Sequence, residues 1–267
     1  MSHFYWLSHR RYIDNGRMRW HAEQANEAFW ADYWRERVTL SYFRKAADAD
    51  LSTDEMGRVL LAEMPIEGRH LEAGCGAGYW VAALRSAGYD VEGIEYARDL
   101  VELVNEVCPE LPVRFGDALA IDRPDNTYAS YLSFGVVEHR QAGPEPFLTE
   151  AYRVLVPGGK LIITVPYLGP VRRLRARFGR YEALPPAPPF FQYGFRSGEF
   201  AGLVAGAGFV VEATRPLFFH RMLMEENVTY RWLYDRRYGV LLRRALSGLF
   251  DGRDGHMLIV IAHKPTG

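Results

Sequence analysis

Residues 71–78 of this 267-residue chain read Leu71-Glu72-Ala73-Gly74-Cys75-Gly76-Ala77-Gly78. A short predicted strand, Arg69–Ala73, leads into the glycines, and a stretch that predicts a helix, Tyr79–Ala87, follows them. Glycines at alternating positions let the backbone turn sharply and approach a ligand without a clash from Cβ. A simple turn would use the same residues, so the meaning of this loop depends on the segments around it.

Predicted strands and helices alternate along most of the chain. The predicted strands are 69–73, 89–94, 112–115, 127–134, 160–166, 208–213 and 256–262. The predicted helices between them are 79–87, 97–107, 145–155 and 194–206, and residues 20–64 also have helical spacings of aromatic side chains. This alternation predicts an α/β fold, a doubly wound, seven-stranded, mostly parallel sheet with helices on both faces.

Composition excludes several classes of protein. The chain is 48% hydrophobic and 24% charged, as in an ordinary globular protein, and its net charge of −1 argues against a surface built for nucleic acid. Two cysteines without a CxxC pair or a His cluster predict neither a disulfide framework nor a metal site. No signal peptide or apolar run of transmembrane length is evident, so we expect a cytoplasmic protein.

The spacing of the glycines separates two kinds of cofactor loop. A dinucleotide fingerprint needs glycine at the sixth position counted from Gly74, which is Tyr79 here. An acidic residue followed by Gly-x-Gly-x-Gly is a different pattern, and with it the chain resembles the class I S-adenosylmethionine-dependent methyltransferases. The resemblance covers about residues 65–165, includes the Pro157-Gly158-Gly159 turn before a strand, and extends loosely to the last strand.

The resemblance implies S-adenosylmethionine as the cofactor and places its contacts. Glu95 ends the next predicted strand, where two carboxylate oxygens suit both ribose hydroxyls, although helix capping would use the same position. Asp117 is expected to accept the adenine amino group, and Glu72 to face the amino-acid end. The full expected set is Glu72, Gly74, Cys75, Gly76, Gly78, Glu95, Tyr96, Asp117, Ala118, Phe134 and Gly135.

His139 is the candidate for general base. It follows the strand along which the methyl group would be presented, and imidazole titrates near neutral pH. Packing against the cofactor is its alternative role. Tyr33, Tyr167 and His220 are candidates for lining the acceptor pocket, and packing in the core is the alternative for each of them.

We expect one methyltransferase domain over residues 1–267. Residues 1–64 would form an N-terminal helical lid, 65–166 the cofactor-binding core, and 167–267 the remaining sheet with late insertions on the acceptor side. The predicted reaction is methyl transfer to a small-molecule acceptor, anionic or aromatic, at oxygen or nitrogen rather than carbon. An NAD(P)-dependent oxidoreductase and a non-catalytic S-adenosylmethionine-binding protein remain the alternatives.

The second half of the chain carries an excess of arginine. Residues 169–256 contain 14 Arg and 8 Asp or Glu, which leaves a balance of +6. A solvated basic face is the plainest interpretation, followed by a site for an anionic acceptor, to which Arg is suited. Contact with a membrane surface or with RNA ranks last, because the density of basic residues is low for either.

Overall fold

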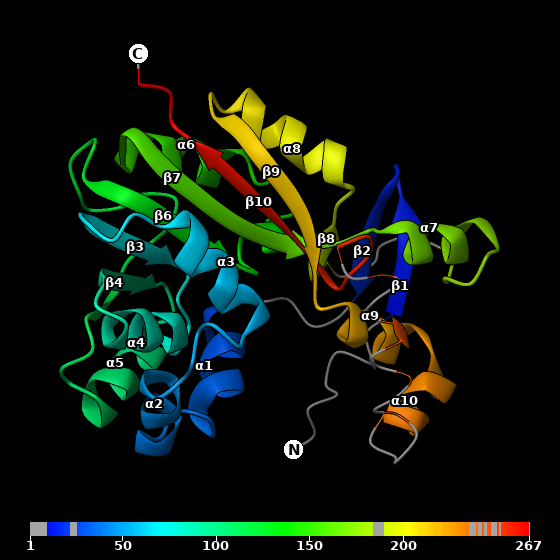
Figure 1. The fold of residues 1–267 in the computed structure, drawn as a ribbon, viewed down its shortest axis with the longest axis horizontal. Helices are drawn as coiled ribbons and strands as arrows, with labels where there is room; N and C mark the ends of the chain where they lie inside the picture. The colour runs from blue at the N-terminus through cyan, green and yellow to red at the C-terminus, as the bar shows by residue number, and fades with distance from the viewer. Residues whose placement is uncertain are drawn as a thin grey trace.

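The computed structural model describes residues 10–21, 26–183, 190–234 and 252–266, and the single positions 239, 242, 245, 246 and 250. Its main sheet has seven strands in the order β5-β4-β3-β6-β7-β10-β9 (Figure 1). All neighbouring strands pair in parallel except β10, which is antiparallel to β7 and β9. The strands are β3 (Arg69–Ala73), β4 (Asp90–Glu95), β5 (Val113–Phe115), β6 (Tyr128–Phe134), β7 (Leu155–Pro166), β9 (Val210–Leu217) and β10 (Met257–His263).

Helices cover both faces of this sheet, so the predicted doubly wound architecture is confirmed. One apolar cluster joins the sheet to α3 (Glu55–Glu63), α4 (Tyr79–Ser86) and α5 (Arg98–Val107). A second cluster joins the other face to α6 (Glu145–Val154) and α8 (Ser197–Gly206). Strand β10 shows why both faces are covered, because its successive side chains point to opposite faces and are all apolar over residues 258–262. Ile259 and Ile261 belong to the first cluster, whereas Leu258, Val260 and Ala262 belong to the second.

The N-terminal region is only partly helical. Helices α1 (Glu27–Arg35) and α2 (Leu40–Ala47) lie where the lid was expected, but Trp20 belongs to a β-hairpin of β1 (Arg10–Asp14) and β2 (Arg17–His21). Asn15 and Gly16 connect these strands with φ values of 48° and 83°. Asn-Gly with positive φ at both positions is the preferred two-residue hairpin turn. The prediction of helix from residue 20 onwards was therefore wrong at its start.

This hairpin forms a second, three-stranded sheet with β8 (Gln192–Gly194), in the order β1-β2-β8. The helix predicted over 194–206 accordingly begins later, at Ser197. Gly194 pairs with Met18, and a side chain at this position would meet the Trp20 ring at 2.7 Å. Close packing on Trp20 thus favours glycine in a strand, where the sequence alone indicated the start of a helix.

Among the described residues, the late insertions include the helices α7 (Pro170–Arg177), α9 (Phe219–Glu226) and α10 (Val228–Tyr234). Strand β9 ends at Leu217, and α9 begins two residues later at Phe219. Residues 235–238 lie outside the described part of the chain, as does most of the stretch up to 251. None of the helices in the described ranges is both long and apolar enough to cross a membrane.

A buried arginine fastens α7 to α9 and to the end of the main sheet. Arg172 is fully buried, and its Nη1 donates to the carbonyl oxygens of Tyr167 and His256 at 2.7 and 3.1 Å. Its Nη2 and Nε donate to Glu225 and Glu226 at 2.8 and 3.0 Å. Each donor group of this guanidinium therefore has a partner, which is the condition for burying a charge.

We predict that Arg172→Ala lowers the free energy of unfolding by roughly 3 kcal/mol, the lower end for breaking a buried ion pair. We expect a loss of stability at the lower end of the range because Arg11 and Arg175 still contact Glu226 in the variant. Urea unfolding checks this prediction, with Arg173→Ala as the matched control, because Arg173 is exposed on the same helix. Equal unfolding midpoints for the two variants would contradict it.

Candidate functional site

A cavity of about 760 Å³ opens at the carboxyl ends of β3, β4 and β6, beside the glycine loop. Ligands of open α/β sheets bind at this edge, because the loops after the strands converge there. Its lining residues are Glu27, Trp30, Trp34, Tyr42, Glu72, Gly74, Cys75, Gly76, Tyr79, Trp80, Glu95, Tyr96, Phe115, Gly116, Asp117, Ala118, Leu119, Phe134, Gly135, Val136, His139, Arg140 and Phe147.

The glycine loop is packed from two sides, which explains its composition. Gly74 has φ +73°, and a Cβ at this position would lie 2.5 Å from Val136. Gly76 has φ +54°, and its Cβ would lie 3.1 Å from the indole of Trp34. A larger residue at either position would combine a strained backbone with a clash. The loop thus lies between the segment after β6 and helix α1.

Glu95, at the tip of β4, holds the loop in place. Its Oε2 accepts from the Gly76 backbone N–H at 3.0 Å, and its Oε1 accepts from the N–H groups of Tyr96 and Ala97 at 2.9 Å each. Burial raises the pKa of this carboxyl, whereas these three hydrogen bonds act to lower it. Glu95 thus holds the turn before α5, which is its alternative role, and it also lines the cavity, where the ribose contact stays a prediction.

Glu72, at the tip of β3, is a buried acid without a complete set of partners. Its side chain lines the cavity, and Oε2 has no hydrogen-bond partner among the described residues. Burial raises the pKa of this carboxyl well above its usual value, and the neighbouring Glu95 raises it further. A cation in the cavity would satisfy this oxygen. The α-ammonium of S-adenosylmethionine is such a group, so the residues present fit the cofactor that the resemblance implies.

The predicted cofactor residues come together at this cavity, with one exception. Every member of the set lines it except Gly78, which instead begins α4 and faces Leu111 and Val113. Asp117 already accepts from the Leu119 backbone N–H at 2.8 Å through Oδ1, so it also holds its own turn. These placements agree with the expected contacts, and the contacts themselves remain predictions.

Aromatic side chains that the sequence did not assign to the cavity form its opposite wall. Trp30, Trp34, Tyr42, Tyr79 and Trp80 come from α1, α2 and α4, and edge-to-face contacts join the rings of Trp34, Tyr42 and Tyr79. Their helical spacing favoured core packing over a pocket. Only the tertiary arrangement turns them toward the loop.

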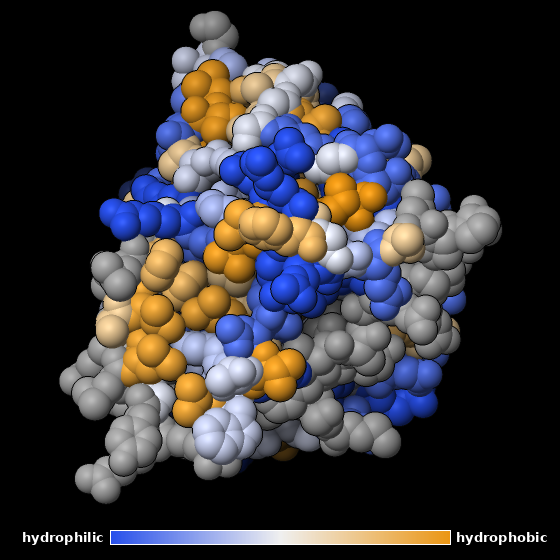
Figure 2. Space-filling view, turned by 90° about the vertical axis from the view of Figure 1, so that its right-hand side faces the viewer, coloured by the Kyte–Doolittle hydropathy of each residue, from blue (hydrophilic) through white to orange (hydrophobic). Residues whose placement is uncertain are grey.

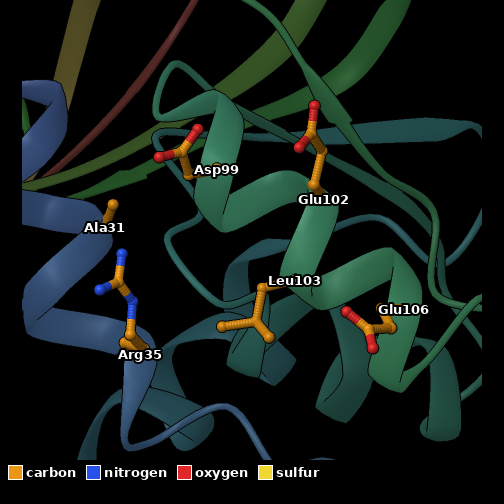
Figure 3. A pocket seen from close by; sticks show the side chains of 6 residues that line it. All are labelled: Ala31, Arg35, Asp99, Glu102, Leu103 and Glu106. Atoms are coloured by element: carbon orange, nitrogen blue, oxygen red, sulfur yellow. The ribbon is translucent and has the colours of Figure 1, made fainter.

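Helix α1 is attached to the core beside this wall. Glu27, at the start of α1, accepts from the backbone N–H of Arg98 at 2.8 Å. Further along the same contact, a shallow hollow lies between Ala31 and Arg35 of α1 and four side chains of α5 (Figure 3). Those four are Asp99, Glu102, Leu103 and Glu106. Contacts with α5 therefore hold α1 over the cavity.

His139 lines the cavity at the end of a short 3₁₀ helix, Val137–His139, which follows β6. Its Nδ1 lies 2.9 Å from the carbonyl oxygen of Phe191, and Trp30 and Phe191 contact the ring edge-to-face. A carbonyl only accepts, so Nδ1 carries a proton and the neutral ring has its lone pair on Nε2. This tautomer is the one that a base acting through Nε2 requires.

The three residues predicted for the acceptor pocket lie elsewhere among the described residues. Tyr33 packs against Phe29 and Trp34 on α1, and the Arg37 guanidinium lies 4.0 Å from the centre of its ring. Tyr167 is buried in the second apolar cluster. His220 stacks on Tyr230 and shares a hydrogen bond of 2.5 Å with its hydroxyl. None of the three is among the residues that line the cavity.

Glu138, the neighbour of His139, is a second buried acid. It is 2% exposed, and its Oε2 has no hydrogen-bond partner among the described residues. Burial raises the pKa of this carboxyl from 4.5 to about 8. Glu138 is not among the residues that line the cavity. The pair Glu138-His139 was visible in the sequence, but the burial of Glu138 was not.

Because the folded-state pKa of Glu138 is raised, its contribution to stability is complete below about pH 4.5 and is lost as the pH rises to about 8. Glu138→Gln stays neutral throughout. We predict that the free energy of unfolding of wild type falls relative to the variant over this window, by at most about 1.4 kcal/mol per pH unit. Urea unfolding at a series of pH values measures the difference. Parallel profiles would contradict the raised pKa.

Comparison with known proteins agrees with this geometry. Residues 71–163 match the methyltransferase domain family. A probable S-adenosylmethionine-dependent methyltransferase of Mycolicibacterium smegmatis is 31% identical over 58% of this chain and 57% of its own length. A demethylmenaquinone methyltransferase of Clavibacter sepedonicus is 30% identical over 55% of this chain and 62% of its own length. The chain thus spans little more than half the length of these curated relatives.

Solved structures share the fold at low sequence identity. An S-adenosylmethionine-dependent methyltransferase of Methanosarcina mazei aligns with a TM-score of 0.54 and 17% identity, over 78% of this chain and 98% of its own. The [4+2]-cyclase SpnF aligns with a TM-score of 0.52 and 22% identity, over 79% of this chain and 80% of its own.

A reaction cannot be deduced from a fold that also carries a cyclase. The family match, the sheet order and the two acids around the glycine loop together identify the class of the domain. Residues 71–163 therefore form a methyltransferase domain on a Rossmann-like sheet, and its similarity to S-adenosylmethionine-dependent methyltransferases implies S-adenosylmethionine as the cofactor.

Proposed function

We propose that this protein transfers a methyl group from S-adenosylmethionine to a small, largely apolar acceptor held against the aromatic wall of its cavity. One observation carries the proposal. Glu72 and Glu95, at the tips of adjacent strands, both line the cavity on either side of the glycine loop. A carboxylate at each place matches the two polar ends of the cofactor, the ammonium and the ribose hydroxyls.

The chain's own residues would divide the binding between them. Glu72 faces the ammonium, and Glu95 accepts from a ribose hydroxyl with the Oε2 lone pair that its three backbone hydrogen bonds leave. Asp117 and the backbone at Ala118 meet the adenine edge, and Tyr96, which is 38% exposed, packs on the ring. Phe134 and Gly135 border the methionine portion.

The bound cofactor supplies a methyl group that its sulfonium has already activated. The protein must then align the acceptor with that group and exclude water, and alignment alone contributes up to about 7–11 kcal/mol in favourable systems. The rings of Trp30, Trp34 and Tyr42 cover the cavity from the lid side. An apolar cover of this kind removes water that would compete with the acceptor.

His139 would take the proton that the acceptor loses. Its Nδ1–H is held by the Phe191 carbonyl, which orients the ring and fixes the tautomer. A base at this place is useful for a hydroxyl, an amine or an acidic ring carbon. Arg140 follows it in the lining and adds a positive charge that would stabilise a developing anion on the acceptor.

The aromatic wall supports an aromatic acceptor, because flat rings stack well on Trp and Tyr. Several relatives are named demethylmenaquinone methyltransferases, and the name of another specifies a C-methyltransferase. We therefore include a quinone or hydroquinone ring among the acceptors to test. The acceptor atom to test is therefore carbon as well as the oxygen or nitrogen that the sequence analysis favoured.

Two measurements test the function. Calorimetry with S-adenosylmethionine and with NAD distinguishes a methyltransferase site from a nicotinamide site, and we expect heat of binding with the former alone. Transfer of labelled methyl to phenol, amine and hydroquinone acceptors then distinguishes an enzyme from a binding protein. Binding of NAD alone would overturn the proposal.

We predict that Glu95→Gln weakens S-adenosylmethionine binding by about 10–100-fold, because hydrogen bonds to a charged group are worth about 1.5–3 kcal/mol. The amide keeps the volume of the side chain but offers only one acceptor oxygen. Calorimetry measures the affinity, and Glu102→Gln on α5, outside this cavity, is the matched control. Unchanged affinity in Glu95→Gln would show that this carboxylate does not hold the ribose.

For His139→Gln we predict a loss of turnover of about 10²–10⁴-fold, the usual contribution of a general base, with little change in cofactor affinity. Labelled methyl transfer to the first acceptor identified gives the rate, and calorimetry gives the affinity. His263→Gln is the control, because His263 pairs with Lys160 at the far end of the sheet. Full activity of His139→Gln would show that His139 has only a packing role.

A further inference from the structure

Helix α7 presents apolar side chains to solvent on one side. Leu174 is 57% exposed and Phe178, directly after the helix, is 68% exposed. Residues four positions apart lie on the same face of a helix, so the two side chains project together. Neither contributes to the apolar clusters of the core.

Positive charges surround this apolar pair. Arg173, Arg177 and Arg180 are exposed, and none of them forms an ion pair with another residue in the described ranges. Residues 170–181 include five arginines and no acidic residue. We call the surface formed by Arg173, Leu174, Arg177, Phe178 and Arg180 the α7 face.

The opposite side of the same helix is firmly held. Arg172 is fully buried between Glu225 and Glu226 of α9, and Arg175 contacts Glu226 at 2.9 Å. The arginines in and directly after α7 therefore have two separate roles. Arg172 and Arg175 attach the helix to the protein, whereas Arg173, Arg177 and Arg180 are exposed and form no ion pair within the described part of the chain.

A second exposed apolar pair lies on the neighbouring insertion. Val228, two residues after Glu226, is 73% exposed, and Trp232 of α10 is 58% exposed. Helices α7, α9 and α10 lie together at the end of the molecule on the right of Figure 1. Figure 2 looks onto this end, where apolar and hydrophilic side chains border each other over the visible surface.

We propose that the α7 face binds the surface of a membrane that contains anionic lipids, with the helix lying in the plane of the interface. Apolar side chains flanked by arginines are the composition that inserts at the boundary between headgroups and acyl chains. Arginines attract the negative surface potential of such a membrane, and Leu174 and Phe178 would be covered by lipid.

Two features favour a lipid surface over the other possible partners. Leu174 and Phe178 stand in the middle of the face, where a nucleic acid would place phosphates rather than apolar atoms. A second copy of this chain would set arginines against arginines across a two-fold axis. Helix α7 follows β7, whose carboxyl end lies at the same edge of the sheet as the cavity. The proposed membrane contact does not depend on methyl transfer.

The test is sedimentation of the full chain with vesicles. We expect binding to vesicles of equal parts phosphatidylcholine and phosphatidylglycerol, little binding to phosphatidylcholine alone, and a decrease with added salt. Arg173→Gln and Arg177→Gln should each lower the partition coefficient about fivefold, which corresponds to about 1 kcal/mol per basic residue. The double variant Leu174→Ser with Phe178→Ser should lower it at least as much as the two arginine changes together.

Matched controls lie on the other side of the molecule. Ile66→Ser removes a side chain that is 59% exposed, and Arg44→Gln removes an exposed arginine of α2. We expect both to bind vesicles like wild type. All changes are at exposed positions, so equal thermal unfolding confirms that each variant folds.

Three outcomes would overturn the proposal. The first is no binding to the anionic vesicles. The second is an equal loss in the α7 variants and the controls, which would indicate unspecific charge attraction. The third is a chain that ignores vesicles but dimerises, or binds a homopolymeric RNA, through the α7 face, shown by loss of that association in the α7 variants.

Discussion

The buried carboxylate of Glu95 is the interaction on which the cavity depends. A carboxylate out of water is costly unless donors surround it, and here the Gly76, Tyr96 and Ala97 backbone N–H groups do so. Those donors belong to the glycine loop and to the turn before α5. One side chain thus fixes the distance between two neighbouring strand tips, and the space between them is where the adenosyl group would lie.

The lid depends on the loop in turn. Trp34 packs closely on Gly76, where a Cβ would lie 3.1 Å from the indole, and Glu27 joins the start of α1 to the start of α5. The polar floor of strand tips and the aromatic cover from α1 and α2 therefore form one enclosure. Low polarity on the cover strengthens the electrostatic interactions of the floor, because less water screens them.

Much of the fold was predictable, for reasons that particular elements illustrate. Strand β10 is a β-branched run and β3 leads into alternating glycines, so local patterns were sufficient for the main sheet. The hairpin was missed because the aromatic spacing around Trp20 outweighed the Asn15-Gly16 signal, which does predict a turn. The sequence does not show that Gly78 lies outside the cavity lining, because its neighbours Leu111 and Val113 are distant in the sequence.

The candidate site was predictable only on its cofactor side. Glu72 and Glu95 follow from strand ends, whereas Trp30, Tyr42 and Tyr79 enter the cavity through tertiary packing that helical spacing does not reveal. Similarly, residues 170–180 contain five arginines, and the sequence alone does not show that Arg172 is buried whereas Arg173 is exposed. Burial decides the role of each of them.

A crystal structure of the full chain with S-adenosylhomocysteine, the cofactor without its methyl group, tests the central claim most directly. The account predicts the ribose hydroxyls within hydrogen-bond distance of Glu95, the amino group beside Glu72, and the sulfur directed toward the aromatic wall. Density for the ligand outside the glycine loop, with both carboxylates turned away from it, would contradict the account.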